Sequence, residues 1–272
     1  LVAGGPLVMR ALREGGGELV PVDSEHSAIL QCLTGCRRVD ADADADVIVR
    51  YPQVRRLVIT ASGGPFREWS AERIARATRD DALRHPTWSM GSKVTVDSAT
   101  LANKALEVIE AHWFFGLDYD AIHVVVHPQS IVHSMLEFVD GSVVAQMGFP
   151  TMELPILYAL THPTRLEDGG TRFDPVQASP LTFEAVDHVR FPACGLGVAA
   201  GRAGGTAPAA FNAANEVAVA AFLADRLPFS GVPDTIDAVL QAHEVRAVES
   251  LDDVLEADRS ARAAALRHIQ AC

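Results

Sequence analysis

Strand-like segments are confined to the first 147 residues of this chain, and their distribution limits the folds it can adopt. Short apolar runs typical of β-strands occur at 18–21, 57–60, 122–126, 135–139 and 142–147. Helical patterns separate these runs, at 6–13, 24–33, 71–78 and 100–115. Because strands mixed with helices pack in layers, this part of the chain predicts an α/β fold, a mixed α+β domain.

The rest of the chain shows no convincing strand pattern. Residues 161–183 are rich in Pro, Gly, Asp and Thr, a composition typical of a linker. Helical periodicity then returns at 194–202, 207–227, 235–242 and 251–269, with Gly204-Gly205, Pro228 and Pro233 between the segments. We therefore predict a C-terminal all-α helical bundle after the mixed domain.

Several polar residues outside the main motifs are predicted to be structural. The segment FNAANE at 211–216 carries polar side chains between helices, where they more often fix packing than carry function. His127 and His133 lie six residues apart, a spacing that suggests no metal geometry. The alternating Asp-Ala run at 39–47 imitates a calcium loop but lacks the Gly and Glu required at its sixth and twelfth positions, so we expect a solvated loop.

Composition excludes some classes of protein. The formal net charge of −12 argues against broad binding to nucleic acid or to an anionic membrane. No run of about 18 apolar residues is present, so no membrane span is expected. The cysteines form no paired CxxC set and are expected to be reduced thiols of a cytoplasmic protein: Cys32, Cys36, Cys194 and Cys272.

The segment VDSATLANKALE at 96–107 is the strongest functional motif. It places Ser98, Asn103, Lys104 and Glu107 at helical spacing, on the expected first turns of a helix. A helix N-terminus offers free N–H groups to a phosphate, and a carboxylate one turn further along can hold a divalent cation. The alternative is that Ser98 only caps the helix and that Lys104 and Glu107 form an exposed ion pair.

The segment VDSEH at 22–26 carries two further carboxylates. Asp23 and Glu25 are two residues apart, so in an extended chain they point to one side. With Glu107 as a third carboxylate they would form a site for Mg²⁺ or Mn²⁺ that is open to substrate and water. The alternative is an N-cap, because Asp or Ser followed by Glu also resembles a capping box. Both interpretations can hold at a strand-to-helix junction.

Two loops could complete an anion site. Ser62-Gly63-Gly64 follows an apolar strand and could form a nest of N–H groups, although Gly-Gly-Pro is also ordinary turn chemistry. The segment 84–93 contains His85, Trp88, Met90 and Gly91. Its composition is typical of a loop that carries an aromatic lid with a hinge at each end. The alternative is a buried Trp that anchors a structural loop.

Five segments together resemble the 1-deoxy-D-xylulose 5-phosphate reductoisomerase family. They are VPVDSEHSAI, TASGGPFRE, HPTWSMGSKVTVDSATLANKALEVIEA, HPQSIVHSM and FNAANEVAVAAFL. The similarity runs from near residue 1 to near residue 270. It implies an oxidoreductase that converts 1-deoxy-D-xylulose 5-phosphate and NADPH to 2-C-methyl-D-erythritol 4-phosphate, in the non-mevalonate pathway of isoprenoid biosynthesis.

The resemblance also implies roles for individual residues. It assigns a divalent metal (Mn²⁺, Mg²⁺ or Co²⁺) to Asp23, Glu25 and Glu107, and it places Gly91 against the nicotinamide. Trp88 and Met90 would form the lid. The residues that it implies touch the substrate, in part through its phosphate, are Ser24, Glu25, Ser62, His85, Ser98, Asn103, Lys104 and Glu107. The expected partners are a small sugar phosphate and a second copy of the chain in a homodimer, with no nucleic acid and no membrane.

Family members begin with a Rossmann-type NADPH-binding domain, and this chain has no G-x-G-x-x-G after a first strand. We therefore expect residues 1–22 to be the tail of that domain, 23–160 the catalytic domain, 161–188 a linker and 189–272 the helical domain. The chain alone is expected not to reduce its substrate with NADPH. Two alternatives are a metal-dependent sugar-phosphate lyase or isomerase without nicotinamide, and a non-catalytic chain.

Overall fold

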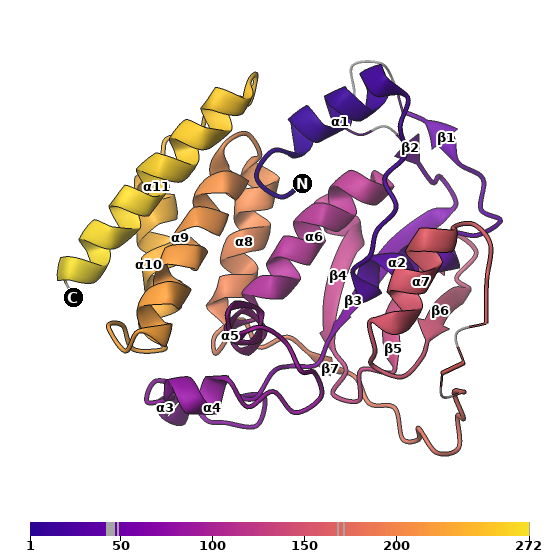
Figure 1. Cartoon of the computed structure of the whole chain (residues 1–272), viewed down its shortest axis with the longest axis horizontal. Coiled ribbons are helices and arrows are strands. Elements are labelled where there is room, and N and C mark those ends of the chain that lie inside the picture. The colour runs from indigo at the N-terminus through magenta and orange to yellow at the C-terminus, as the bar shows by residue number, and fades with distance from the viewer. Residues whose placement is uncertain (42–46, 48, 168, 171, 272) are drawn as a thin grey trace. The chain divides into compact units, whose positions relative to one another are not determined.

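The computed structural model describes residues 1–41, 47, 49–167, 169, 170 and 172–271 (Figure 1). These residues form two compact units, each built from separated stretches of the chain. Unit 1 comprises Leu1–Val8, Gly63–Glu110 and Asp187–Cys272, and unit 2 comprises Met9–Ser62 and Ala111–Val186. The helices are α1 Gly5–Gly15, α2 Ser24–Cys32, α3 Ala71–Ile74, α4 Arg79–Ala82, α5 Ser92–Thr100, α6 Ala102–Phe115, α7 Glu153–Thr161, α8 Pro192–Ala203, α9 Ala207–Leu223, α10 Gly231–Ala242 and α11 Leu251–Ala271, with a short 3₁₀ helix at Tyr119–Ala121.

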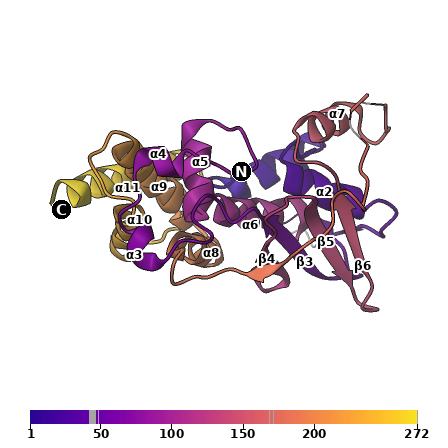
Figure 2. The same ribbon diagram turned by 90° about the horizontal axis from the view of Figure 1, so that it is seen from below.

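Unit 2 is built around a five-stranded mixed sheet with the strand order β6-β5-β3-β4-β7 (Figure 2). Its strands are β3 Val54–Ala61, β4 Ile122–Val126, β5 Val132–Phe138, β6 Val143–Met147 and β7 Glu184–Ala185. The central strand β3 pairs in parallel with β4 and antiparallel with β5. Helix α2 packs on β5 and β6. The predicted α/β layer structure is therefore confirmed, and strands β1 Val39–Asp40 and β2 Val49–Arg50 form a separate small ladder.

The predicted hairpin between the fifth and sixth strands is confirmed. Gly141 adopts a φ of +85°, a conformation that costs glycine little, and the Phe138 amide donates to the Ser142 carbonyl at 2.9 Å. The Asp140 carboxylate accepts the Ser142 amide at 2.9 Å, which closes the turn. Strand β5 begins at Val132, three residues before the predicted start at 135.

Two local predictions in unit 2 were wrong, and one helix was missed. The run 18–21 is not a strand, and Pro21 lacks the N–H that a ladder position needs. Helix α7 was not predicted. The two-residue strand β7 follows the linker, where no strand was expected, because its pairing with β4 is set by tertiary contact and not by an apolar pattern. The Asp-Ala run at 39–47 lies mostly outside the described residues.

Two predicted helices have other bounds in the structure. The segment 71–78 is helical only at Ala71–Ile74, and Thr78 caps the next helix, α4: its hydroxyl accepts the Asp81 amide at 3.2 Å while the Asp81 carboxylate accepts the Thr78 amide at 3.1 Å. The segment predicted as one helix at 100–115 is preceded by α5 and begins only at Ala102. Leu101 separates the two helices with a φ of +60°.

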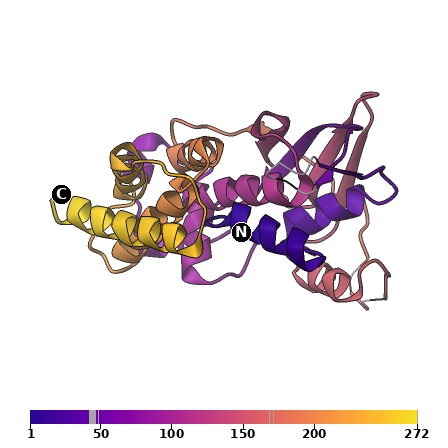
Figure 3. The same cartoon turned by 90° about the horizontal axis from the view of Figure 1, so that it is seen from above.

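The C-terminal helical bundle is confirmed in unit 1. Helix α9 packs against α8, α10 and α11, and Figure 3 shows α11, in yellow, running along the other bundle helices. Helix α9 is alanine-rich and buried on nearly all sides, as expected for a helix at the centre of a core. Phe211, Ile236 and Val232 are fully buried there. Within the described residues, no helix combines the length and the apolar character needed to cross a membrane.

Candidate metal and phosphate site

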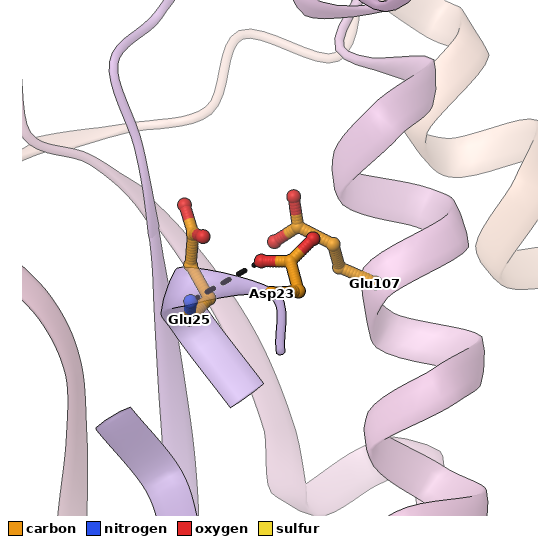
Figure 4. Close-up of side chains that lie close together, drawn as sticks. All are labelled: Asp23, Glu25 and Glu107. Atoms are coloured by element: carbon orange, nitrogen blue, oxygen red, sulfur yellow. Dashed lines mark hydrogen bonds between the residues drawn. The ribbon is translucent and has the colours of Figure 1, made fainter. Parts of the chain in front are cut away.

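Three carboxylates converge as the sequence predicts. Asp23 is the N-cap of α2, and its Oδ1 accepts the Glu25 amide at 3.2 Å, so the capping alternative also holds. Glu107 lies on α6, which is unbroken from Ala102 to Phe115. Ligand oxygens of Asp23, Glu25 and Glu107 all lie within 4.8 Å of one another, and Figure 4 shows their side chains turned towards one another.

The donor chemistry of this group fits a hard divalent cation. All three ligands are carboxylates, which Mg²⁺ and Mn²⁺ prefer over sulfur ligands. Asp23 and Glu25 are partly exposed, whereas Glu107 is 2% exposed. Three carboxylates this close repel one another unless a cation or a donor offsets their charge. The donor set therefore fits a cation site with two partly exposed ligands and one buried ligand.

Lys104 neutralises the buried member of the group. Its Nζ lies 2.8 Å and 2.7 Å from the two carboxylate oxygens of Glu107, and the Asn103 amide donates to the same carboxylate. The ion pair of the alternative interpretation therefore exists, but it is buried and not exposed: Lys104 is 7% exposed. A lysine buried beside a carboxylate at the start of a helix places a cation where an anionic ligand can share it.

Ser98 approaches this helix start from the preceding helix. It lies in the last turn of α5 and is therefore not an N-cap of α6, as the alternative required. Leu101, with a φ of +60°, separates the two helices, and the Thr100 hydroxyl accepts the Ala102 amide at 3.3 Å. The first N–H groups of α6 and the Ser98 hydroxyl thus belong to one short junction.

His85 fixes the orientation of the Ser98 hydroxyl. The Nδ1 of His85 accepts the backbone amides of Thr87 at 3.1 Å and Trp88 at 2.8 Å. This nitrogen therefore carries no proton, so Nε2 carries one and donates to the Ser98 oxygen at 3.1 Å. Burial, together with the charge of Lys104, lowers the pKa of His85 below its usual value. The Ser98 proton is then available to another acceptor.

The Ser-Gly-Gly turn touches the same junction. Gly64 has a φ of +66°, and a Cβ on it would lie 2.7 Å from the Ser98 carbonyl oxygen, so only glycine fits. Ser62 precedes this contact by two residues. Its expected part in phosphate binding stays a prediction.

The remaining candidate residues have the following local surroundings. The Ser24 hydroxyl donates to Glu25 at 2.6 Å and is 7% exposed. Trp88 and Met90 are partly buried, and Gly91 is the exposed N-cap of α5. The lid role of the first two and the cofactor contact of Gly91 stay predictions.

The structural interpretation of His127 is confirmed. It is fully buried, its Nε2 accepts the Ile131 amide at 3.2 Å, and its Nδ1 donates to the Thr182 carbonyl at 2.8 Å. Sequence reasoning gave no role to Asp97, although it lies directly before Ser98. The structure buries it against Asn215 from FNAANE. An acidic residue inside the VDSATLANK motif was the signal that could have drawn attention to it.

Comparison with known proteins identifies the family of this chain. Residues 19–115 match the family described as 1-deoxy-D-xylulose 5-phosphate reductoisomerase C-terminal domain, and residues 147–264 match the family described as DXP reductoisomerase C-terminal domain. A 1-deoxy-D-xylulose 5-phosphate reductoisomerase of Gloeobacter violaceus is 54% identical over 262 residues, and one of Synechococcus sp. strain JA-2-3B'a(2-13) is 53% identical over 262 residues. Both alignments cover 96% of this chain and 64% of the relative, so the chain spans less than two thirds of the length of these relatives.

Solved structures give the same result. The Zymomonas mobilis reductoisomerase in complex with NADPH is 40% identical, with a TM-score of 0.87, over 100% of this chain and 67% of that one. A DOX-P reductoisomerase in complex with NADPH, fosmidomycin and magnesium is 36% identical, with a TM-score of 0.85, over 99% of this chain and 68% of that one. These similarities extend over nearly the whole chain, including the three converging carboxylates and the junction of α5 and α6. The chain belongs to the 1-deoxy-D-xylulose 5-phosphate reductoisomerase family.

Proposed function

We propose that this chain forms the metal- and substrate-binding part of a reductoisomerase. That enzyme would convert 1-deoxy-D-xylulose 5-phosphate and NADPH to 2-C-methyl-D-erythritol 4-phosphate. The observation that carries the proposal is the meeting of Asp23, Glu25 and Glu107 within 4.8 Å, one helical turn from Lys104. A site for a hard cation beside donors for a phosphate suits a phosphorylated hydroxyketone, which can occupy both at once.

The three carboxylates would hold Mg²⁺, Mn²⁺ or Co²⁺. Such a cation supplies Lewis-acid chemistry, polarising a carbonyl and stabilising negative charge on substrate oxygens. Asp23 and Glu25 are oriented by the start of α2, since the Asp23 carboxylate is fixed by the Glu25 amide and the Glu25 carboxylate by the Ser24 hydroxyl. Because the start of α2 already holds these two side chains in place, they would lose little conformational entropy when a cation binds.

The phosphate would bind at the junction of α5 and α6. The N–H groups at the start of α6 and the Lys104 ammonium supply positive charge, and Asn103 adds an amide donor. The Ser98 hydroxyl, which accepts from His85, can donate its proton to a phosphate oxygen. Ser62 would add a further hydroxyl.

NADPH is proposed as the reductant because two of the similar structures are described as complexes with NADPH. Gly91 would contact the nicotinamide, and Trp88 and Met90 would close over the substrate and exclude water. A homodimer in the cytoplasm is part of the same proposal. The expectation that these 272 residues alone do not oxidise NADPH stays a prediction.

The phosphate role is tested by replacing Lys104. The affinities of 1-deoxy-D-xylulose 5-phosphate and its dephosphorylated analogue are measured calorimetrically in the presence of Mn²⁺. Because hydrogen bonds to charged groups contribute about 1.5–3 kcal/mol, Lys104→Ala should lower the affinity for the phosphorylated ligand by about 10- to 100-fold. The dephosphorylated analogue should bind almost unchanged. Mn²⁺ affinity should not fall, since Glu107 loses a competing cation.

Arg259→Ala is the matched control. Arg259 also forms an i,i+3 pair with a glutamate, at 2.7 Å, but on the exposed surface of α11. It should change neither affinity. Equal losses for the phosphorylated and dephosphorylated ligands in Lys104→Ala would contradict a phosphate role.

A further inference from the structure

A buried carboxylate joins the helical bundle to the proposed phosphate site. Asp97 precedes Ser98 on α5 and is 1% exposed. Its Oδ1 accepts the side-chain amide of Asn215, on α9, at 2.9 Å, and its Oδ2 lies 2.7 Å from the Lys93 ammonium. Asn215 is fully buried. These contacts all lie within unit 1.

Burying this carboxylate is costly, which makes its partners significant. Burial raises the pKa of Asp97, and the nearby Lys93 and the Asn215 amide oppose that rise. Lys93 is partly exposed, so Asn215 is the buried partner that fixes direction. An apolar contact would tolerate rotation of α5, whereas a hydrogen bond between two buried side chains sets one orientation.

The backbone of Asp97 is tied to the start of α6 as well. Its carbonyl accepts the Thr100 hydroxyl at 3.2 Å, and that hydroxyl accepts the Ala102 amide at 3.3 Å. A displacement of Asp97 therefore moves both the Ser98 hydroxyl and the first turn of α6, the two elements expected to meet the phosphate.

Helix α8 contacts the same helix start at a second point. A Cβ on Gly197 would lie 2.4 Å from the Cβ of Ala105, the residue after Lys104. Helix α8 therefore packs against α6, and helix α9 is hydrogen-bonded to α5. The helical bundle therefore contacts the junction of α5 and α6 at two independent points.

We propose that Asn215 is a positioning residue for phosphate binding: through Asp97 it sets the place of the Ser98 hydroxyl and of the α6 N-terminus. This inference rests on the proposed function. It assigns to the helical bundle, and to FNAANE, a part in ligand affinity that sequence reasoning had treated as packing alone.

The test compares Asn215→Ala with Asn212→Ala. Asn212 lies one turn earlier on α9, and its side-chain amide donates to Glu216 at 3.1 Å and not to Asp97. The probes are Mn²⁺ alone and 1-deoxy-D-xylulose 5-phosphate with Mn²⁺ present. Asn215→Ala should lower the affinity for the sugar phosphate by about tenfold, which corresponds to the loss of one buried hydrogen bond to a charged group. Mn²⁺ affinity should stay the same, and Asn212→Ala should change neither.

A second variant separates positioning from folding. The exchange Asp97→Asn with Asn215→Asp keeps the hydrogen bond and reverses its donor and acceptor, but it moves the negative charge away from Lys93. It should therefore restore part of the sugar-phosphate affinity that Asn215→Ala loses. If Asn215→Ala does not fold, Asn215→Ser takes its place with the same expectations.

Two outcomes would overturn the inference: a folded Asn215→Ala that binds the sugar phosphate normally, or one that loses Mn²⁺ and sugar phosphate equally. If the unchanged chain shows no preference for the phosphorylated over the dephosphorylated ligand, the proposed function itself fails.

Discussion

The ion pair of Lys104 and Glu107 differs from the pair of Arg259 and Glu256 in environment and not in spacing. Both are i,i+3 pairs at 2.7 Å. The Lys104 and Glu107 side chains are 9% and 3% exposed, whereas those of Arg259 and Glu256 are 68% and 56% exposed. An exposed pair contributes about 0–1 kcal/mol, and removing one partner of a buried pair costs about 3–5 kcal/mol. The buried pair therefore depends on both of its charges far more than the exposed pair does.

At the same scale, His85 provides a test by pH. Its Nδ1 accepts two backbone amides, and burial together with Lys104 lowers its pKa, so protonation must break contacts that the neutral ring makes. NMR titration should give a pKa below about 6.5 and a proton on Nε2 in the neutral form.

Linkage gives the sign of the effect on stability. The unfolded chain binds a proton at His85 more readily than the folded chain does. The contribution of neutral His85 to the free energy of unfolding is therefore present above about pH 6.5 and is lost as the pH falls through the lowered pKa. His85→Asn, whose Oδ1 can accept the same two amides, should lose less free energy of unfolding over that range. A proton on Nδ1, or a pKa above the usual value, would contradict the assignment.

At the scale of elements, local chemistry explains which predictions succeeded. The hairpin at Asp140-Gly141 and the start of α2 at Asp23 carry turn and cap residues that act locally. The break between α5 and α6 has no such signal: Leu101 takes a positive φ, which its side chain disfavours, and the surrounding fold imposes it. Strand β7 is likewise set by pairing with β4.

Gly197 gives a test of helix packing. A Cβ there would lie 2.4 Å from Ala105 Cβ and 2.5 Å from the Phe211 ring, which is fully buried. Gly197→Ala should therefore lower the free energy of unfolding by about 1–3 kcal/mol despite the better helix propensity of alanine.

Gly195→Ala, on the same helix, is its control. The nearest atom to an added Cβ there is the His188 Nδ1 at 3.7 Å, so this change should be neutral or stabilising by up to about 1 kcal/mol. Chemical denaturation measures both values. Equal effects of the two substitutions would show that α8 does not press on α6 as described.

At the scale of the whole molecule, the sequence predicted which carboxylates converge better than it predicted the packing around them. The convergence of Asp23, Glu25 and Glu107 followed from the motifs and is seen in the structure. Burial of Lys104 and the contact between Asp97 and Asn215 did not follow from the sequence, because both depend on how distant segments pack. Asp97 and Asn215 are more than a hundred positions apart. Periodicity within a helix carries no information about which distant helix covers it.

The central claim is that three carboxylates of this chain hold a divalent cation, and Mn²⁺ binding to the purified chain tests it most directly. Glu107→Gln keeps the shape of the side chain and one acceptor oxygen for Lys104 but removes the charge. It should lower the affinity for Mn²⁺ by at least about tenfold, because the site loses one charged ligand. Glu110→Gln, on the same helix and outside the carboxylate group, should leave Mn²⁺ affinity unchanged. A folded Glu107→Gln that binds Mn²⁺ as tightly as the unchanged chain would contradict the account.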